Sequence, residues 1–374
     1  MIRRMIVLPI ILAVMSSVPP SRAELQSHRV CRECHSDIFE LWKNSLHATA
    51  YTNATFQAAF MKLLLDRGRA TAKECLRCHA PAAYLENEIG GHSINLAGGV
   101  TCSFCHSISA VRGGDIDTCY VLDTSNAVYG PYKPSNVSAH DIQYSPLHLA
   151  AEMCAGCHEH TNDNGARVLE TYSEWSASPY AKQEVYCQNC HMPIMYELDV
   201  ADNLNVTDYY VTAHEFQGGH SGINLSHAVH LETSAQRDGR VLKVEVRVTN
   251  AESGHKLPTG VPVRKLVLTV TMKSEDGIRV ASARKVYRKT LQDKYGAIIE
   301  NAPDMFLNAT SVYTDNRIEP KETRIEHFSF EIPKWASRFK LETVLNYEYT
   351  RPILSEELVS VQMARNVLRS HSIK

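Results

Sequence analysis

The chain has 374 residues, which is enough for two domains of ordinary size. Its 39 basic and 41 acidic residues give a formal net charge of −2, and no basic run occurs, which argues against a nucleic-acid partner. Beyond the N-terminus, no segment is apolar over the length that a membrane-spanning helix needs, so no membrane span is predicted in the mature chain.

The N-terminus has the features of a secretory signal peptide. Arg3 and Arg4 form a basic segment, residues 5–18 are mostly apolar, and Ser21 and Ala23 place small residues at the cleavage positions. We predict that residues 1–23 are removed and that the mature protein is periplasmic or extracellular. A retained membrane anchor is the alternative, but the apolar run is short for a spanning helix.

Five copies of Cys-x-x-Cys-His account for ten of the eleven cysteines. Each copy is a c-type haem attachment signature, in which both thiols form thioether bonds to haem and the adjacent His binds the iron as proximal ligand. Zinc knuckles, disulfides and thioredoxin-like sites do not predict five identical triplets. We therefore predict five covalently bound haem c groups. The cysteines are Cys31, Cys34, Cys75, Cys78, Cys102, Cys105, Cys154, Cys157, Cys187 and Cys190, and the proximal ligands are His35, His79, His106, His158 and His191. The remaining cysteine, Cys119, is predicted to be a buried small residue.

Residues 24–232 are predicted to form a pentahaem cytochrome c domain. Apolar residues follow the first motif at helical spacing from Ile38 to Ala50 and again over 56–65, whereas 111–144 is rich in turn-forming residues and is predicted to be a long loop. A haem is a large apolar group, so five of them can replace most of a side-chain core. We expect short helices and irregular connections, which makes this domain mostly α and irregular.

Residues 233–374 are predicted to form an all-β domain. From about residue 240 the apolar period becomes two, with runs at 241–248, 266–272, 280–286, 323–332 and 341–349. Asp276-Gly277 is a hairpin signal between two of these runs. The spacing favours an immunoglobulin-like sandwich of about seven strands, with a barrel as the alternative. The overall fold class is therefore mixed.

The five motifs are too close in sequence for each haem to be insulated in its own pocket, so neighbouring haems are expected to lie near van der Waals contact. The 18 His residues far exceed the five proximal ligands, which allows a distal imidazole for each iron. Such bis-His ligation gives closed, low-potential irons. The distal candidates are His47, His148, His214, His220 and His255, with His92 and His140 in reserve. His47 follows His35 on what is predicted to be one helix, at a separation that turns it toward a different haem.

Over roughly residues 28–230, the chain resembles the cytochrome c554-type family of multihaem cytochromes. The segments that carry the resemblance are CRECHSDIFELWKNSLHATA, CLRCHAP, GGVTCSFCH, SPLHLAAEMCAGCH and WSASPYAKQEVYCQNCHMP. The later segment GHKLPTGVPVRKLVLTV resembles a β domain that is often fused to such haem domains. The resemblance implies electron transfer between packed haem pairs and implies that His47 ligates a later haem. It also implies that the haem held by the second motif, at His79, can lack a distal ligand. A fifth motif and the appended β domain depart from the family's tetrahaem pattern.

Three functions are compatible with these features. The first is electron transfer along the haems between periplasmic or extracellular redox proteins or from a quinol-linked donor. The second is a multihaem oxidoreductase that acts on a small nitrogen or sulfur compound at an open iron. The third is a subunit of an extracellular conductive filament built by self-association. Because all five motifs end in His and the histidine supply is large, electron transfer is favoured over catalysis.

Overall fold

The computed structural model describes residues 25–87, 94–112, 119–123, 125, 127–133, 140–196, 198–202, 211–336, 338–353 and 355–373. The predicted signal peptide, residues 1–23, lies outside the described residues. In these described ranges, no helix is both long and apolar enough to cross a membrane.

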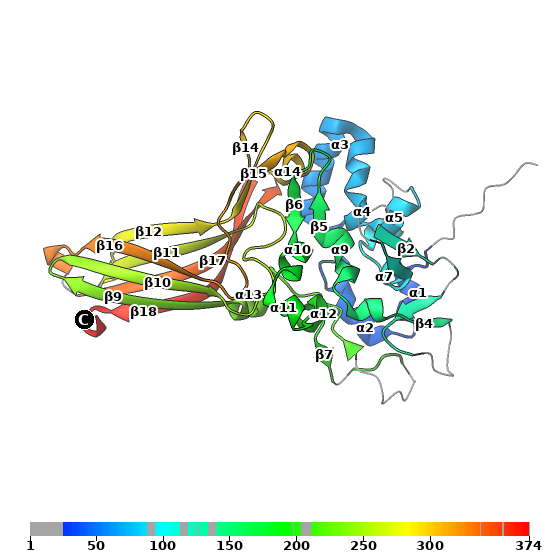
Figure 1. Ribbon diagram of the computed structural model, residues 1–374, viewed down its shortest axis with the longest axis horizontal. Helices are drawn as coiled ribbons and strands as arrows, with labels where there is room; N and C mark the ends of the chain where they lie inside the picture. Colours follow the sequence, from blue (N-terminus) through cyan, green and yellow to red (C-terminus); the bar gives the residue numbers. More distant parts are fainter. Residues whose placement is uncertain are drawn as a thin grey trace, which may run out of the picture.

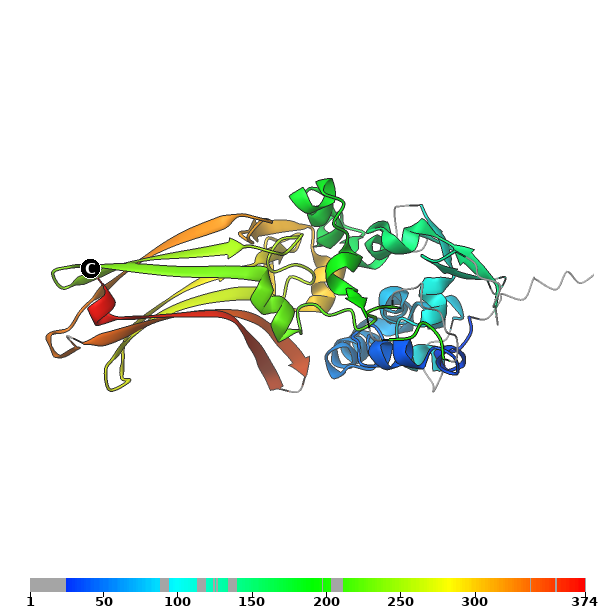
Figure 2. The same ribbon diagram turned by 90° about the horizontal axis from the view of Figure 1, so that it is seen from below.

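The chain forms two parts that lie end to end, which we call the helical part (residues 25–228) and the β part (residues 229–373) (Figure 1). Short helices gather in the helical part, and the long strands extend away from them with the C-terminus at their far end. Figure 2 shows the strands leaving the helices in two layers. The predicted mixed fold class is confirmed.

The helical part consists of short elements joined by irregular segments. Its helices are α1 (His28–Arg32), α2 (Ser36–Lys43), α3 (Ala54–Glu74), α4 (Leu76–His79), α5 (Pro81–Leu85), α6 (Ile94–Ala97), α7 (Cys102–His106), α9 (Glu152–His158), α10 (Thr171–Ser176), α11 (Pro179–Lys182), α12 (Cys187–His191) and α13 (Gly222–Ala228), with the 3₁₀ turn η1 (Pro146–Leu149). Short strands pair between them: β1 (Ile108–Val111) with β2 (Tyr120–Leu122), β3 (Val128–Gly130) with β4 (Ile142–Tyr144), β5 (Glu159–Thr161) with β6 (Arg167–Glu170), and β7 (Ile194–Met195) with β8 (Val211–Thr212).

The segment after the first motif is less helical than its apolar spacing predicts. Helix α2 ends at Lys43, and His47 lies in the turns that follow it, so the prediction that His35 and His47 share one helix is wrong. The Ser45 hydroxyl accepts a hydrogen bond from the Ala48 amide at 3.1 Å, a turn interaction that competes with helix continuation. The second predicted run, residues 56–65, is confirmed as part of α3.

The sandwich of the β part consists of two antiparallel sheets. One has the order β16 (Thr323–Glu331), β10 (Val241–Asn250), β9 (Val229–Asp238), and the other β12 (Arg279–Tyr287), β11 (Lys265–Ser274), β17 (Phe339–Ile353), β18 (Ser355–Arg369). Alternate residues of β10 face the core, and Leu242, Val246 and Val248 are 0% exposed. They pack in one cluster with residues of the other sheet such as Leu268 and Leu345, which makes this the apolar core of the β part.

The sequence predicted the central strands β10, β11 and β17 and two of the four edge strands, β12 and β16. The Asp276-Gly277 hairpin joins β11 to β12, and Gly277 takes the positive φ of +84° that such a turn needs. The edge strands β9 and β18 were not predicted, because charged and polar residues interrupt their apolar pattern, as is typical of edges exposed to solvent.

A small unpredicted sheet joins the two parts. Its strands, in spatial order, are β14 (Ile298–Ile299), β13 (Lys289–Gln292) and β15 (Ser311–Asp315). Helix α14 (Ala302–Asn308) lies between β14 and β15 in the sequence. Leu291 and Met305 of this region pack with Val168 of β6. The side chain of Asn162 donates to the Ala309 carbonyl at 2.8 Å. The two parts therefore share buried apolar and polar contacts.

Candidate functional site

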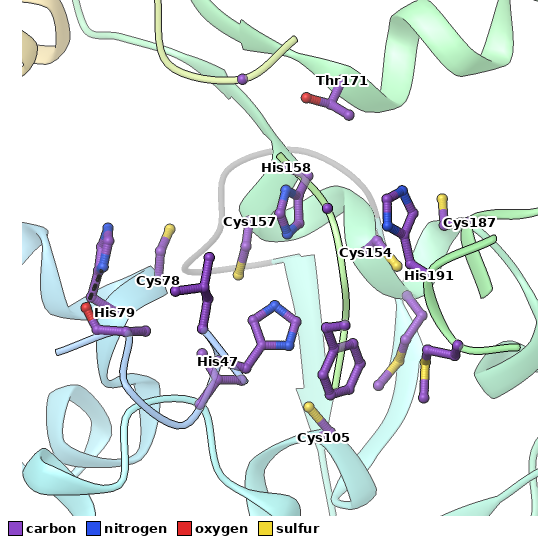
Figure 3. Close-up of a pocket in the computed structure, with 18 of the residues that line it drawn as sticks. His47, Cys78, His79, Cys105, Cys154, Cys157, His158, Thr171, Cys187 and His191 are labelled. Atoms are coloured by element: carbon purple, nitrogen blue, oxygen red, sulfur yellow. Dashed lines mark hydrogen bonds between the residues drawn. The ribbon is translucent and has the colours of Figure 1, made fainter. Parts of the chain in front are cut away.

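A continuous cavity of about 2260 Å³ lies within the helical part and extends to the nearest loops of the β part. All ten motif cysteines and all five motif histidines line it. Its volume exceeds the upper end, roughly 1,000 Å³, of pockets that hold one small ligand. Figure 3 shows motif side chains from separate helices directed into this shared space, among them Cys78, Cys157, His158 and His191. We call it the motif cavity.

A single helical turn directs each motif toward the motif cavity. Motifs three to five lie within α7, α9 and α12, and the turn of the first motif is closed by a hydrogen bond from the His35 amide to the Cys31 carbonyl at 2.9 Å. On such a turn, positions i, i+3 and i+4 share one face. Both thiols and the imidazole of each motif therefore reach the same side.

Four of the five motif imidazoles are oriented by backbone carbonyls that come from other segments. The bonded pairs are His35 Nδ1 with Val200 O at 2.6 Å, His79 Nδ1 with Ala50 O at 2.9 Å, His106 Nδ1 with Tyr129 O at 2.7 Å and His191 Nδ1 with Gln217 O at 2.5 Å. A carbonyl can only accept, so each Nδ1 carries the proton. This arrangement fixes the ring and leaves Nε2 as the nitrogen available to a metal.

Further imidazoles face the motif histidines. The ring centres of His47 and His158 lie 6.3 Å apart, those of His191 and His255 lie 6.4 Å apart, those of His35 and His140 lie 6.2 Å apart, and those of His106 and His148 lie 5.4 Å apart. The structure thus brings three of the predicted distal candidates, His47, His148 and His255, opposite motif imidazoles.

The other two distal candidates are placed differently. His214 lies close enough to His106 and His35 for their charges to affect its pKa, and its Nδ1 donates to the Thr212 carbonyl at 2.7 Å. His220 shares a hydrogen bond of 2.9 Å between its Nδ1 and the Tyr349 hydroxyl. Of the two reserve candidates, His140 faces His35, and His92 lies outside the described residues.

The enclosed imidazoles are neutral at ordinary pH. Burial lowers the pKa of His47 to about 3, with a further contribution from the nearby His158. Burial also lowers the pKa of His148, His158, His214 and His255 to about 4 in each case. An uncharged imidazole is the form that ligates a metal, so no proton has to be displaced for these side chains to bind one.

His79 has a different neighbour from the other motif histidines. The ring of Phe56, from the first turn of α3, stacks on it with ring centres 3.9 Å apart and an interplanar angle of 16°. Within the described ranges, no second imidazole ring pairs with His79. The flat face of the His79 imidazole is therefore covered by an aromatic side chain.

Thiols of different motifs lie next to one another. The thiols of Cys31 and Cys102, of Cys78 and Cys157, and of Cys154 and Cys187 lie close enough for one thiol to shift the pKa of the other, and Cys105 lies close enough to Cys154 to raise its pKa. These contacts place motif one beside motif three, and they place motif four beside motifs two, three and five. Any groups attached to these thiols would be in close contact.

One guanidinium on the cavity wall has no ion pair to a described carboxylate. Arg264, at the start of the second sheet, donates from Nη1 to the Thr259 carbonyl at 3.2 Å, and no ion pair to it occurs among the described carboxylates. Its charge adds to burial in lowering the pKa of His158 and His255. A guanidinium in this position suits a carboxylate group of a bound cofactor, such as a haem propionate. Paired thiols, oriented imidazoles, apolar walls and this cation together fit covalently attached haem.

Sequence reasoning missed the aromatic residues that contact these imidazoles. Phe56 stacks on His79, and the Phe216 ring lies 4.3 Å from the His47 ring. Phe216 is two residues beyond His214, in the segment that also carries the ligand candidate His220. Because aromatic residues usually mark ordinary core, no local signal identified either of them.

Residues 30–107 match the family model described as cytochrome c554 and c-prime. The whole structure is similar to that of a penta-heme cytochrome c552 from Thermochromatium tepidum, with 22% identity, 93% of this chain and 99% of that chain covered, and a TM-score of 0.73. A putative ApaA protein from Bordetella pertussis also matches, with 11% identity, coverage of 37% of this chain and 89% of that chain, and a TM-score of only 0.20. None of the curated proteins compared with the chain matches it.

Gly99 is predicted to be irreplaceable because it lets motif three approach the His47 turn. At its φ of +62°, a Cβ would lie 2.4 Å from the His47 carbonyl oxygen and 2.9 Å from that of Ala48. Gly99→Ala should therefore destabilise the holoprotein by more than the roughly 1–3 kcal/mol of an ordinary strained backbone position. The measurement is the melting temperature.

Gly165→Ala is the matched control for this prediction. Gly165 has a φ of +82°, but nothing lies within 4 Å of the Cβ that a side chain would add. Both variants carry backbone strain and only Gly99→Ala adds a clash. Equal losses of melting temperature would show that the contact with the His47 turn is unimportant.

Proposed function

We propose that the chain is a multihaem c-type cytochrome that transfers electrons along five covalently attached haems between redox partners outside the cytoplasm. The observation that carries the proposal is that all fifteen motif residues line one cavity. Groups that share one cavity are close enough for electrons to pass between them. The bound haem would supply the one-electron ferric–ferrous change. We also propose that the partners are redox proteins or a quinol-linked donor. The proposed location is periplasmic or extracellular.

In this proposal, each motif holds one haem. Two thiols anchor the edge of the ring, and the adjacent imidazole binds the iron through Nε2. The hydrogen bonds at Nδ1 of His35, His79, His106 and His191 hold these ligands in position and increase their basicity. Arg264 would neutralise a propionate.

The facing imidazoles would complete the coordination of most irons. Two iron–nitrogen bonds of about 2 Å, together with the distance from each nitrogen to its ring centre, give a ring separation of about 6 Å. The separations of 6.3 Å for His47 with His158 and 6.4 Å for His191 with His255 fit this value. We propose that each of these two pairs would hold one iron. His148 faces His106 at 5.4 Å, which is closer than this value, and its Nε2 lies 3.2 Å from the Cys105 carbonyl, so it would bind the iron at His106 through Nδ1.

The iron at His35 has two available imidazoles. His140 faces the ring at 6.2 Å, and His214, the sequence-based candidate, lies near both His35 and His106. Either of them gives a bis-His iron. His220 also lines the cavity, with its Nδ1 bonded to the Tyr349 hydroxyl, and it is left without an assigned iron.

The contacts between motif cysteines suggest the electron route. Motif one adjoins motif three, and motif three adjoins motif four, which also adjoins motifs two and five. Electrons would therefore pass through the haem of motif four to reach either end. In this route, the haem at His191 would lie next to the β part, which carries His255, and the haem at His79 would lie next to α3, which carries Phe56.

The surroundings of His79 favour a second candidate function. The Phe56 ring stacks on this histidine, and no imidazole faces it in the described part of the chain. An iron at this position would keep an open coordination site. The protein would then act as an oxidoreductase on a small nitrogen or sulfur compound, with the other haems supplying electrons. Filament formation, the third sequence-based hypothesis, remains a prediction without a specific supporting contact.

The number of haems is predicted to be five. The intact mass of the mature holoprotein should exceed that of the polypeptide by five haem increments. The Cys154→Ala/Cys157→Ala double variant should lose one increment, because it removes both thioether bonds of motif four. A holoprotein with fewer than five increments would contradict the proposal.

His47→Ala is predicted to open one iron. Without the imidazole that faces His158, one of the five ferric haems should become high-spin, and electron paramagnetic resonance would detect the new signal. The control is His230→Ala, which removes an exposed imidazole on β9. An entirely low-spin spectrum of His47→Ala would refute the assignment.

Cyanide is predicted to bind at one haem of the native protein. An open iron at His79 needs no ligand to be displaced, so a stoichiometric spectral change should appear at low cyanide concentration. The absence of any fast-binding site would exclude the oxidoreductase candidate and leave electron transfer in place.

A further inference from the structure

The loop that carries His255 belongs to the β part, yet it reaches the motif cavity. It follows β10, and its shape is held by a hydrogen bond from the Asn250 side chain to the His255 carbonyl at 2.8 Å. The Ser253 hydroxyl lies 3.0 Å from His255 Nδ1, and the Lys256 carbonyl lies 3.0 Å from the same nitrogen. These contacts turn the ring so that it faces His191.

A buried carboxylate of the helical part binds this loop. Glu174 of α10 accepts a hydrogen bond from the Thr259 hydroxyl at 2.7 Å and another from the Lys256 amide at 3.2 Å, both at Oε2. Its side chain is 3% exposed. The two donors lie on the C-terminal side of His255, so Glu174 fixes the segment that follows the imidazole.

Arg317 of the β part neutralises Glu174 and contacts the same loop. Its Nη1 lies 2.5 Å from Glu174 Oε1, and its side chain is also 3% exposed. It donates to the Pro258 carbonyl at 3.4 Å and forms two hydrogen bonds of 2.8 Å to Asp315. Reciprocal backbone hydrogen bonds of 2.9 and 3.0 Å join the next residue, Ile318, to Leu257. The arginine is therefore a rigid support for the loop.

An ion pair that is this deeply buried contributes geometry more than stability. Removing two charges from water costs about as much as their attraction returns, so a pair of apolar residues could often replace it without loss of stability. The oxygens and nitrogens of this charged pair form hydrogen bonds to the loop at Lys256, Pro258 and Thr259. Apolar residues could not form these bonds.

We propose that Glu174 and Arg317 are positioning residues that hold His255 against the haem of motif five, so that the β part closes this iron. The proposal rests on the assignment of His191 and His255 as axial ligands. Loss of the pair would release the loop and open the sixth coordination position. Since the axial ligand is one determinant of haem potential, the pair would also keep this haem at the potential of a bis-His centre.

The test uses the ferric holoprotein and its spin state. Glu174→Gln removes the charge but preserves size, and Thr259→Val removes one hydrogen bond from the loop. Arg317→Gln removes the guanidinium. In each variant we expect one of the five haems to become partly high-spin, with the largest fraction in Arg317→Gln. Added imidazole should return that haem to the low-spin state, and its reduction potential should rise in the absence of imidazole.

Met305→Ala is the control for general weakening of the junction between the two parts. Met305 of α14 is 1% exposed and packs with Val168 of the helical part, outside the ion pairs of Glu174 and Arg317. It should lower the melting temperature and leave all haems low-spin. High-spin haem in this variant to the same extent would overturn the proposal, because any damage to the junction would then open the iron.

His255→Ala separates failure of this inference from failure of the proposed function. If this variant opens one iron and the Glu174, Thr259 and Arg317 variants remain low-spin, the positioning role is wrong and the ligation stands. If His255→Ala itself remains low-spin, the assigned ligation is wrong and the positioning role fails with it. Glu174→Gln and Thr259→Val are conservative enough to decide the question if Arg317→Gln does not fold.

Discussion

The presentation of two thiols and one imidazole on one helical turn is the constraint on which the rest of the structure depends. Each such turn has to face its cofactor, and five turns leave little room for an apolar core of the ordinary kind. The largest apolar cluster accordingly lies in the sandwich, and the clusters of the helical part are small. The short helices and irregular connections follow, because they surround the motif cavity instead of packing on one another.

The β part is more than an appended module in this account. The loop after β10 brings His255 to the motif cavity, and Arg264 at the start of the second sheet brings a positive charge to it. The small sheet and α14 bury apolar residues against β6. A sandwich supplies a rigid frame for such loops, since its own core does not depend on the cavity.

Local patterns predicted the motifs, the central strands and the hairpin at Gly277, because each is encoded within a few neighbouring residues. Which histidines face one another across the motif cavity was harder to predict. His47 was expected to serve a later haem through the resemblance, but only the structure brings it opposite His158 and shows that it lies in a turn. His140 was held in reserve, and only the structure brings its ring near His35. The Glu174–Arg317 pair joins residues 143 positions apart, with no local sign in either segment. Such contacts depend on the tertiary fold.

The most direct test of the central claim is X-ray diffraction from crystals of the holoprotein, with anomalous maps calculated at the iron absorption edge. The account predicts five iron peaks in the motif cavity, with one between His47 and His158, one between His191 and His255, and one beside His79 without a facing imidazole. Fewer than five peaks, or an iron at His158 or His191 without the assigned second imidazole, would contradict it.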